Sequence, residues 1–416
     1  MKYLGFLFLM LFYTSIYSQI DSVKYYFVSS EYQKAIFFAE KNSVSTNLTL
    51  IDVKYLCLSY KVLGDYRKAI SIIEKYDAIY KNSKELAFLK SEILLKYGRS
   101  YQAQKVIEQL LLTDSTNTKY LNLAERIYKY RKDFKLALKM ANQLYLIDSS
   151  SIIVNYKRAY YLAKLKIYDK SLVALYKTIE LDSTYVDALR WMAKIYSAHL
   201  ESDSAIKYID KAINYEPENI TAYEERANIY YRKHYYFRAI KDFQRLEGAH
   251  QAKRIHRYKI GVCYQQMRQP DNALKVLKSI WREDSTDHKC AKALGFTYYD
   301  LKQFEKSRFY FEKSLKLIEP DKFLKASIYQ QLVNVNYSIN NKKEIDKALD
   351  GLFENSNAYF ILYDLAYKYD EGNKKSLALE YYIRYSKMPK FVESRSYEAV
   401  KRRIQQLKED NFAKQK

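Results

Sequence analysis

The segment Tyr66-Arg67-Lys68-Ala69-Ile70 repeats the pattern of Tyr32-Gln33-Lys34-Ala35-Ile36 after a step of 34 residues. The small residue at the fourth position recurs with the same step along most of the chain, at Ala35, Ala69, Ala103, Ala137, Ser171, Ala205, Ala239, Ala273 and Ser307. A second, mostly aromatic series keeps this step at Tyr26, Tyr60, Leu94, Tyr128, Leu162, Tyr196, Tyr230, Tyr264 and Tyr298. Two series in one register do not arise by chance, so the chain is a repeat array.

These motifs resemble the tetratricopeptide repeat (TPR) family, whose 34-residue unit is a helix–turn–helix. The segment Ala188–Tyr196 looks like the first helix of that unit, and Ser204–Pro217 looks like the second helix with its closing proline. Gly64–Ala69 resembles the turn and the start of the second helix in another copy. The resemblance runs from about Tyr26 to Lys390. It implies an all-α, right-handed superhelical solenoid of helical hairpins with a generic binding role.

The repeat pattern has a direct physical reading. Small residues in both helices of a hairpin let them approach closely, while apolar residues such as Ile73 and Phe311 fill the space between them. One hairpin cannot bury all its apolar faces, so it stacks on its neighbours. Most loops carry Asp-Ser, which we expect to cap the following helix. These pairs are Asp114-Ser115, Asp148-Ser149, Asp182-Ser183 and Asp284-Ser285.

The register slips after Ser307. Residues 323–353 still predict two helices, and a last unit spans residues 359–390, so we expect about eleven units within residues 19–390. The segment 393–412 predicts a single polar helix with Lys401-Arg402-Arg403 on one side. We assign residues 391–416 to a C-terminal capping helix and a basic tail, because repeat arrays need a solvated end.

The chain has a formal net charge of +23, from 71 Lys and Arg and 48 Asp and Glu. This balance favours acidic proteins, anionic polymers or phospholipid headgroups as partners. The joint enrichment in Lys, Tyr, Ile and Asn is equally explained by an AT-rich genome. The chain has only 8 Gly and 4 Pro, the residues that mark turns. This composition favours helices joined by short loops over an all-β fold.

The N-terminus predicts export. Lys2 precedes an apolar run from Leu4 to Tyr13, which is about half the roughly 20 residues that a spanning helix needs. We expect a signal peptide over residues 1–18, cleaved after Ser18, and a periplasmic or envelope location in a bacterium. An uncleaved anchor or a buried first helix is the alternative. We expect no further transmembrane segment and, given export, no nucleic-acid partner.

Nothing in the sequence matches a catalytic motif: there is no phosphate-binding glycine loop, nucleophile elbow or zinc helix. We therefore expect neither an enzyme nor a cofactor. His256, Cys263, His288 and Cys290 fall on neighbouring helices, but their spacing matches no zinc pattern, and we expect no metal. Cys57 is most simply a small core residue.

In the TPR family, fixed positions of the first helix line a concave binding groove. The resemblance transfers this role to Asn122, Arg126, Lys129, Tyr156, Tyr160, Lys164, Arg190, Lys194, Asn228, Tyr231, Arg232 and Tyr258. Such cations and amides around an aromatic floor suit a peptide with carboxylates. The alternative is that they are solvated charges of a Lys-rich chain.

Two hypotheses for function follow. The first is a scaffold that binds a protein or peptide segment, acidic in character, in the groove. The second is a structural or assembly factor that contacts an anionic envelope polymer or a membrane surface through its charge. Salt distinguishes them, since screening weakens charge-driven binding more than binding to partly buried aromatic rings.

Overall fold

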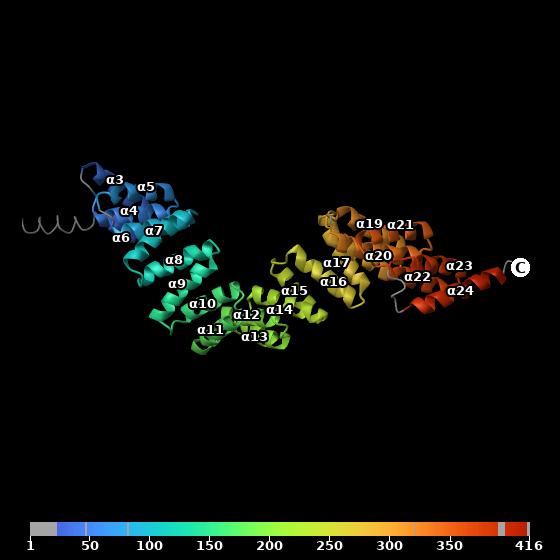
Figure 1. Ribbon diagram of the computed structural model, residues 1–416. Helices are drawn as coiled ribbons and strands as arrows, with labels where there is room; N and C mark the ends of the chain where they lie inside the picture. The colour runs from blue at the N-terminus through green and yellow to red at the C-terminus, as the bar shows by residue number, and fades with distance from the viewer. Residues whose placement is uncertain (1–22, 46–47, 81–82, 320, 390–395, 414–416) are drawn as a thin grey trace, which may run out of the picture. The chain divides into compact units, whose positions relative to one another are not determined.

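A computed structural model of the chain describes residues 23–45, 48–80, 83–319, 321–389 and 396–413, and all regular structure in these ranges is helical. The chain divides into two compact units, residues 1–218 and 219–416. The first unit contains α2 (Val23–Val28), α3 (Tyr32–Ser45), α4 (Leu50–Val62), α5 (Tyr66–Asp77), α6 (Lys84–Lys96), α7 (Ser100–Thr113), α8 (Thr118–Tyr130), α9 (Phe134–Ile147), α10 (Ile152–Lys164), α11 (Tyr168–Leu181), α12 (Val186–Ala198) and α13 (Ser202–Tyr215) (Figure 1).

The second unit continues the same pattern of short helices (Figure 1). It contains α14 (Ile220–Arg232), α15 (Tyr236–Gly248), α16 (Arg254–Gln266), α17 (Pro270–Glu283), α18 (His288–Asp300), α19 (Phe304–Leu317), α20 (Lys322–Ser338), α21 (Lys342–Asn355), α22 (Phe360–Glu371), α23 (Lys375–Ser386) and α24 (Tyr397–Ala413).

Consecutive helices pair into hairpins, as α4 does with α5 and α10 with α11. The second helix of one hairpin then contacts the first helix of the next, as α5 contacts α6 and α17 contacts α18. First helices of neighbouring hairpins also contact one another, as α10 does α12 and α16 does α18. We call the first helices A helices and the second B helices, and we name the two faces of each unit after them. This arrangement confirms an all-α solenoid of helix–turn–helix hairpins.

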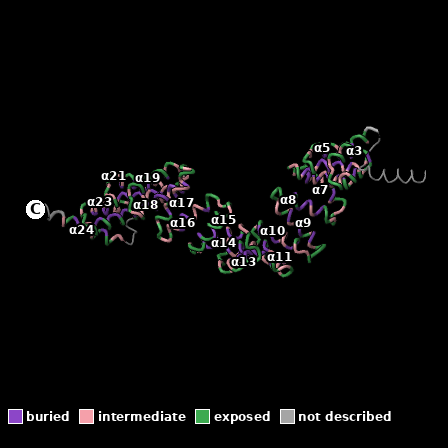
Figure 2. Tube along the Cα trace, turned by 180° about the vertical axis from the view of Figure 1, so that it is seen from behind, coloured by how far each residue is buried: buried purple, intermediate pink, exposed green. Residues whose placement is uncertain are grey.

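The recurring small residues lie where the two helices of a hairpin cross. All nine of them, from Ala35 to Ser307, are fully buried. The two serines in this series have their own explanation, because the Ser171 hydroxyl donates to the Ala159 carbonyl at 2.8 Å and the Ser307 hydroxyl to that of Gly295 at 2.8 Å. A serine therefore fits this position, since its hydroxyl finds an acceptor on the partner helix. Buried residues follow the helix interfaces within each unit (Figure 2).

The turn from an A helix to a B helix has one conformation throughout the regular array. Its central residue is left-handed, with φ of 85° at Gly98, 61° at Lys166 and 64° at Leu200. The next amide donates back over five residues, as the Ile167 amide does to the Leu162 carbonyl at 2.9 Å. This is the Schellman motif, which satisfies the last carbonyls of the A helix.

The expectation that the Asp-Ser pairs cap the following helix was wrong. The Asp148 carboxylate accepts from the Ser150 amide at 2.9 Å, so it closes the turn after α9. The cap of α10 is Ser151, whose hydroxyl accepts from the Val154 amide. Asp114, Asp182 and Asp284 close the equivalent turns in the same way. An aspartate that follows a helix forms an Asx turn with the residue two positions on, which leaves the next cap to a later side chain.

The register slip after Ser307 has a simple cause. Helix α20 has 17 residues whereas the A helix before it, α18, has 13. The polar helix predicted near the C-terminus is α24, which packs on α23 and buries Val400 and Leu407. The signal peptide expected at residues 1–18 lies outside the described residues, as do residues 390–395, which connect α23 to α24.

Candidate functional site

Three A helices of the first unit bring an aromatic pair and three lysines together. Tyr160 on α10 and Trp191 on α12 meet edge to face, with ring centroids 5.3 Å apart and an interplanar angle of 87°. Lys129 of α8 lies 5.4 Å from the Tyr160 centroid, and Lys194 lies 4.8 Å from that of Trp191. We call Lys129, Tyr160, Lys164, Trp191 and Lys194 the lysine–aromatic patch.

Lys164 occupies the centre of this patch. Its Nζ lies 5.4 Å from the Tyr160 centroid and 5.2 Å from the Trp191 centroid, within the range of cation–π attraction. Tyr160 and Lys164 are four residues apart on α10, so they share one helix face. Among the residues that the structure describes, neither Lys129 nor Lys164 forms an ion pair with a carboxylate. Their charge is therefore available to a ligand.

The aromatic floor extends from the patch to two further rings. Tyr156 lies 6.4 Å from Tyr160 and 5.0 Å from Tyr185, measured between ring centroids. Partial burial raises the pKa of Tyr160 and, more strongly, that of Tyr156. Both phenols therefore stay neutral at physiological pH, and they can stack on a ligand or donate a hydrogen bond to it.

Three other predicted residues of the first unit already have partners. Asn122 accepts a hydrogen bond from Lys157 at 3.1 Å. Arg126 lies 3.9 Å from Glu92, and Arg190 forms an ion pair at 2.9 Å with Asp187 of its own helix. The Arg190 side chain is only 16% exposed. These pairings reduce the positive charge that the arginines present, whereas Lys129 and Lys164 form no ion pair among the described residues.

The remaining four predicted residues belong to the second unit. Asn228, Tyr231 and Arg232 lie on α14, and Tyr258 lies on α16. Lys259 donates to the Asn228 side-chain oxygen and lies 5.7 Å from the Tyr231 centroid. Burial raises the pKa of Tyr258 to about 12. These residues form a smaller cation–aromatic cluster on the A face of that unit.

Sequence reasoning missed Trp191 as part of the site. It also missed Glu125, which occupies the small-residue position of an A helix, 34 residues after Ser91. Glu125 is 1% exposed, its carboxylate lies 2.7 Å from Lys157, and Tyr161 donates to it. The sequence could have indicated this contact, because Glu125 stands where other A helices have a small buried residue. A buried carboxylate is costly without a partner, so a cation or a donor was to be expected beside it.

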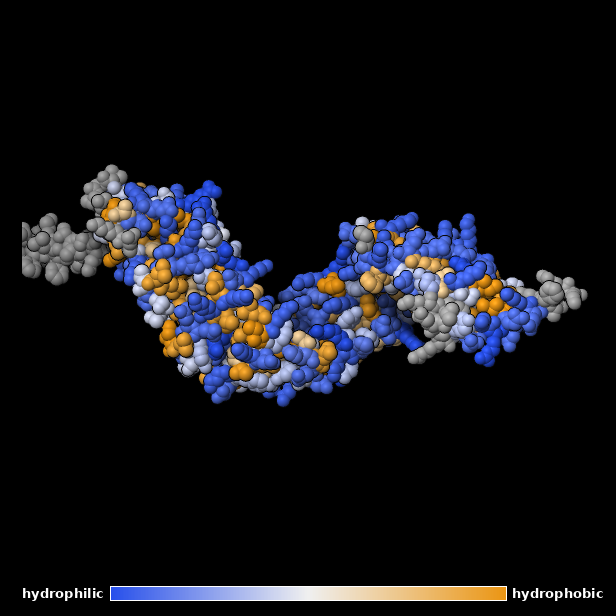
Figure 3. Space-filling model, viewed as in Figure 1, coloured by the Kyte–Doolittle hydropathy of each residue, from blue (hydrophilic) through white to orange (hydrophobic). Residues whose placement is uncertain are grey.

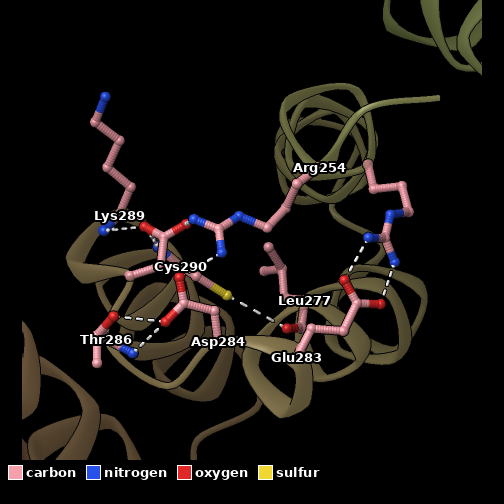
Figure 4. Close-up of polar contacts among 9 residues, drawn as sticks. Arg254, Leu277, Glu283, Asp284, Thr286, Lys289 and Cys290 are labelled. Carbon is pink, nitrogen blue, oxygen red and sulfur yellow. Dashed lines mark hydrogen bonds and ion pairs between the residues drawn. The ribbon is translucent and has the colours of Figure 1, made fainter.

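A second set of ionic contacts links α16 to the α17–α18 turn in the second unit (Figure 4). Arg254 contacts both Asp284 and Asp287, the latter at 3.3 Å. Together with the Thr286 hydroxyl, Arg254 lowers the pKa of Asp284 to about 2. The Cys290 thiol donates to the Leu277 carbonyl at 3.3 Å (Figure 4). These ionic contacts connect one repeat to the next and stabilise the array.

The structure describes the surroundings of the three cysteines and of His256. Cys57, Cys263 and Cys290 are buried free thiols, and burial raises the pKa of each to about 12. His256 contacts Glu224 at 3.1 Å. Within the described ranges, no group of three His, Cys, Asp or Glu side chains is placed to hold a metal ion. None of the helices there combines the length and apolar character that crossing a bilayer requires.

No model of a known protein family matches the sequence. Among curated proteins, the TPR repeat-containing protein YpiA of Bacillus subtilis (strain 168) is 26% identical over 167 residues. That match covers 39% of this chain and 39% of YpiA, so the chain spans about two fifths of its relative's length.

Solved structures with similar folds include further repeat proteins. The C-terminal part of a TPR repeat-containing protein from Cytophaga hutchinsonii has a TM-score of 0.47 at 16% identity, covering 57% of this chain and 95% of that one. A tetratricopeptide repeat protein from Parabacteroides merdae has a TM-score of 0.44 at 15% identity, with 65% and 98% coverage. YrrB, described as a TPR protein with an unusual peptide-binding site, has a TM-score of 0.39 at 19% identity, with 45% and 95% coverage. The 34-residue register, the hairpins that it produces and the repeats of the curated relative agree, and the chain has a tetratricopeptide-repeat fold.

Proposed function

We propose that this chain is a non-catalytic scaffold that binds an acidic peptide segment on the A face of its first unit. The lysine–aromatic patch is the centre of that site. The observation that carries the proposal is the position of Lys164, which lies beside two aromatic rings and has no carboxylate partner among the described residues. A peptide carboxylate supplies the missing partner.

The physical setting strengthens such a contact. Tyr160 and Trp191 are partly buried and exclude water from one side of Lys164, which lowers the local dielectric and strengthens the ion pair. Lys129 and Lys194 flank the rings at 5.4 and 4.8 Å, so carboxylates spaced along an extended peptide meet successive cations. The neighbouring Tyr156 and Tyr185 add stacking surface.

Trp191 makes the site directly measurable. The Trp281→Phe background leaves Trp191 as the only tryptophan, since the chain has two. We expect the capped peptide Gly-Glu-Ser-Glu-Gly-Glu-Ser-Glu to change its fluorescence saturably. The double substitution Lys129→Gln with Lys164→Gln should weaken binding at least tenfold, because each lost charge-assisted contact contributes about 1.5–3 kcal/mol.

The control variant carries Lys135→Gln and Lys139→Gln, which make the same change in net charge on exposed positions of α9. Equal weakening by the two double variants would show that the peptide responds to net charge rather than to the patch. Binding of the same peptide with Gln in place of Glu, at equal affinity, would also contradict the proposal.

The charge-driven alternative remains the competing hypothesis, and its basis is the net charge of +23. It predicts that heparin, as an anionic polymer probe, binds wild type and both double variants alike. It also predicts near-complete loss of binding between about 50 and about 300 mM salt, because exposed charges are screened over a Debye length. Patch binding should survive this change in part, since its aromatic contacts are not screened.

We further propose that the chain is exported and cleaved after Ser18. The supporting observation is the basic start, the apolar run and the small residue at the cleavage point. Intact mass and N-terminal sequencing of the protein recovered from native cells test it. A mature chain that begins at Gln19 is expected, and a chain that retains Leu4–Tyr13 would contradict it.

A further inference from the structure

A pocket lies on the B face of the first unit, away from the A-helix positions of the lysine–aromatic patch. It has a volume of about 570 Å³, and its walls come from α9, α10 and α11. That volume lies within the range of small-ligand sites, which are roughly 300–1,000 Å³. Hydrophobic residues reach the surface around these helices (Figure 3), and Val173 in the pocket rim is 71% exposed.

The lining of this pocket is cationic and apolar. Arg158, Lys170 and Lys177 contribute positive charge, and none of the lining residues is acidic. Lys177 forms an ion pair with Glu180 at 3.2 Å. Arg158 and Lys170 have no such pair within the described part of the chain. Other basic residues of the unit, such as Lys61 and Lys157, pair with glutamates.

Arg158 is held in place for a ligand. Its guanidinium lies 3.8 Å from the Tyr145 centroid, and its Nε donates to the Asn142 side-chain oxygen at 2.9 Å. These two contacts fix the plane of the group and leave both terminal amino groups without an acceptor among the described residues. A planar guanidinium fixed in this way is suited to a carboxylate, which accepts two parallel hydrogen bonds.

A buried amide in the same wall lacks a donor. Asn155 lines the pocket and is 1% exposed. Its Nδ2 donates to the carbonyls of Ser149 and Ser151 at 2.8 and 2.9 Å, which determines the orientation of the amide. Its Oδ1 accepts no hydrogen bond from the described residues. A buried acceptor without a partner is costly, but this oxygen has almost no accessible surface, so a ligand in the pocket does not reach it.

We infer that this pocket is a second binding site, and that it takes a peptide segment with a side-chain carboxylate next to an apolar side chain. The carboxylate pairs with Arg158 and Lys170, and the apolar side chain packs on Leu138, Leu162 and Val173. The inference stands independently of the A-face proposal, since the two sites share helix α10 but use different side chains.

The probe is a fluorescein-labelled peptide, Gly-Ser-Glu-Leu-Glu-Val-Gly-Ser, with an amidated C-terminus. We expect it to bind the full chain in a fluorescence anisotropy titration. It should bind at least tenfold more tightly than two versions, one with Gln for both Glu residues and one with Ser for Leu and Val. Equal affinity for all three peptides would overturn the inference.

Two variants locate the site. Arg158→Gln removes the guanidinium, and Val173→Glu places a repelling carboxylate at the exposed rim without touching the core. Both variants should bind the labelled peptide at least tenfold more weakly than wild type does. Their helical circular dichroism should be unchanged. Lys129→Gln with Lys164→Gln should leave its affinity within twofold. If Val173→Glu binds as wild type does, or if only the A-face variant loses binding, the pocket is not the site.

Discussion

At the scale of single residues, the distance between paired helices is set by a missing methyl group. A Cβ added at Gly295 would lie 2.7 Å from the Phe311 ring, and one at Gly261 would lie 2.8 Å from Leu277. Both glycines occupy the small position of an A helix, where the sequence predicted close approach. Contacts below 3.0 Å force a neighbour to move, so these positions limit how near the two helices lie.

We expect Gly295→Ala to lower the free energy of unfolding by about 1–3 kcal/mol, because it overpacks the α18–α19 interface. Urea unfolding followed by Trp281 fluorescence measures it, since the Trp281 ring packs 5.7 Å from Tyr310 of α19. Adding Phe311→Leu should recover part of the loss by making room for the methyl group. An unchanged urea midpoint in the single variant would show that this contact does not limit the packing.

Glu125 shows what a register can reveal about one residue and what it cannot. The repeat assigns it to a small, buried position, and the structure places it there at 1% exposure. Its partners, Lys157 and Tyr161, lie one repeat later, and the register does not say that their side chains converge on it. That convergence depends on how successive A helices stack.

At the scale of elements, the turn between the helices of a hairpin carries a recurring strain. Its left-handed position holds Gly at residues 64 and 98, but Lys at 132, 166 and 302 and Leu at 200. A left-handed conformation costs a residue with a Cβ roughly 1–2 kcal/mol, whereas glycine adopts it freely. The sequence indicated this turn at Gly64, but most of the later copies carry ordinary side chains there.

Lys166→Gly should therefore raise the free energy of unfolding by up to about 1 kcal/mol, because glycine adopts the left-handed conformation without strain. The gain is partly offset because glycine also makes the unfolded chain more flexible. The reciprocal change, Gly98→Ala, should destabilise it by a similar amount, since φ there is 85°. Thermal unfolding of both single variants beside wild type checks the pair. Shifts of the same sign in the two variants would contradict the turn assignment.

At the scale of the whole molecule, the principal contacts among the described helices of each unit join neighbouring hairpins, so local events need not spread. This matters for function because the lysine–aromatic patch lies on α8, α10 and α12, far along the chain from α20–α24. Ligand binding stabilises the segments that it contacts, by mass action, and a quasi-one-dimensional array confines that effect.

Hydrogen exchange measured by mass spectrometry tests this expectation. Saturation with the glutamate-rich octapeptide should slow amide exchange in α8–α12, and α20–α24 should exchange as in the free chain. Slower exchange confined to the second unit would place the site there, around Asn228 and Tyr258. Uniform slowing along the chain would contradict a localised site.

The sequence by itself determined the architecture of this protein. Helix packing requires small and aromatic residues at the same places in every copy, so they recur in the sequence with a 34-residue step. This step identified the hairpins and the small positions from Ala35 to Ser307, all of which are fully buried. The expectation of a surface with cations around aromatic rings came from the resemblance to the TPR family, which assigned residues of this sequence to a groove.

Only the tertiary structure showed which of those cations already have a carboxylate partner. Arg190 has a carboxylate partner in Asp187, while Lys164 lies beside Tyr160 of its own helix and Trp191 of the next A helix. Only the structure showed the B-face pocket, where Tyr145 and Asn142 of one hairpin orient Arg158 of the next. The reason is physical: a repeat register determines which helix face a residue lies on, whereas charge pairing depends on side chains that meet across the stacked repeats.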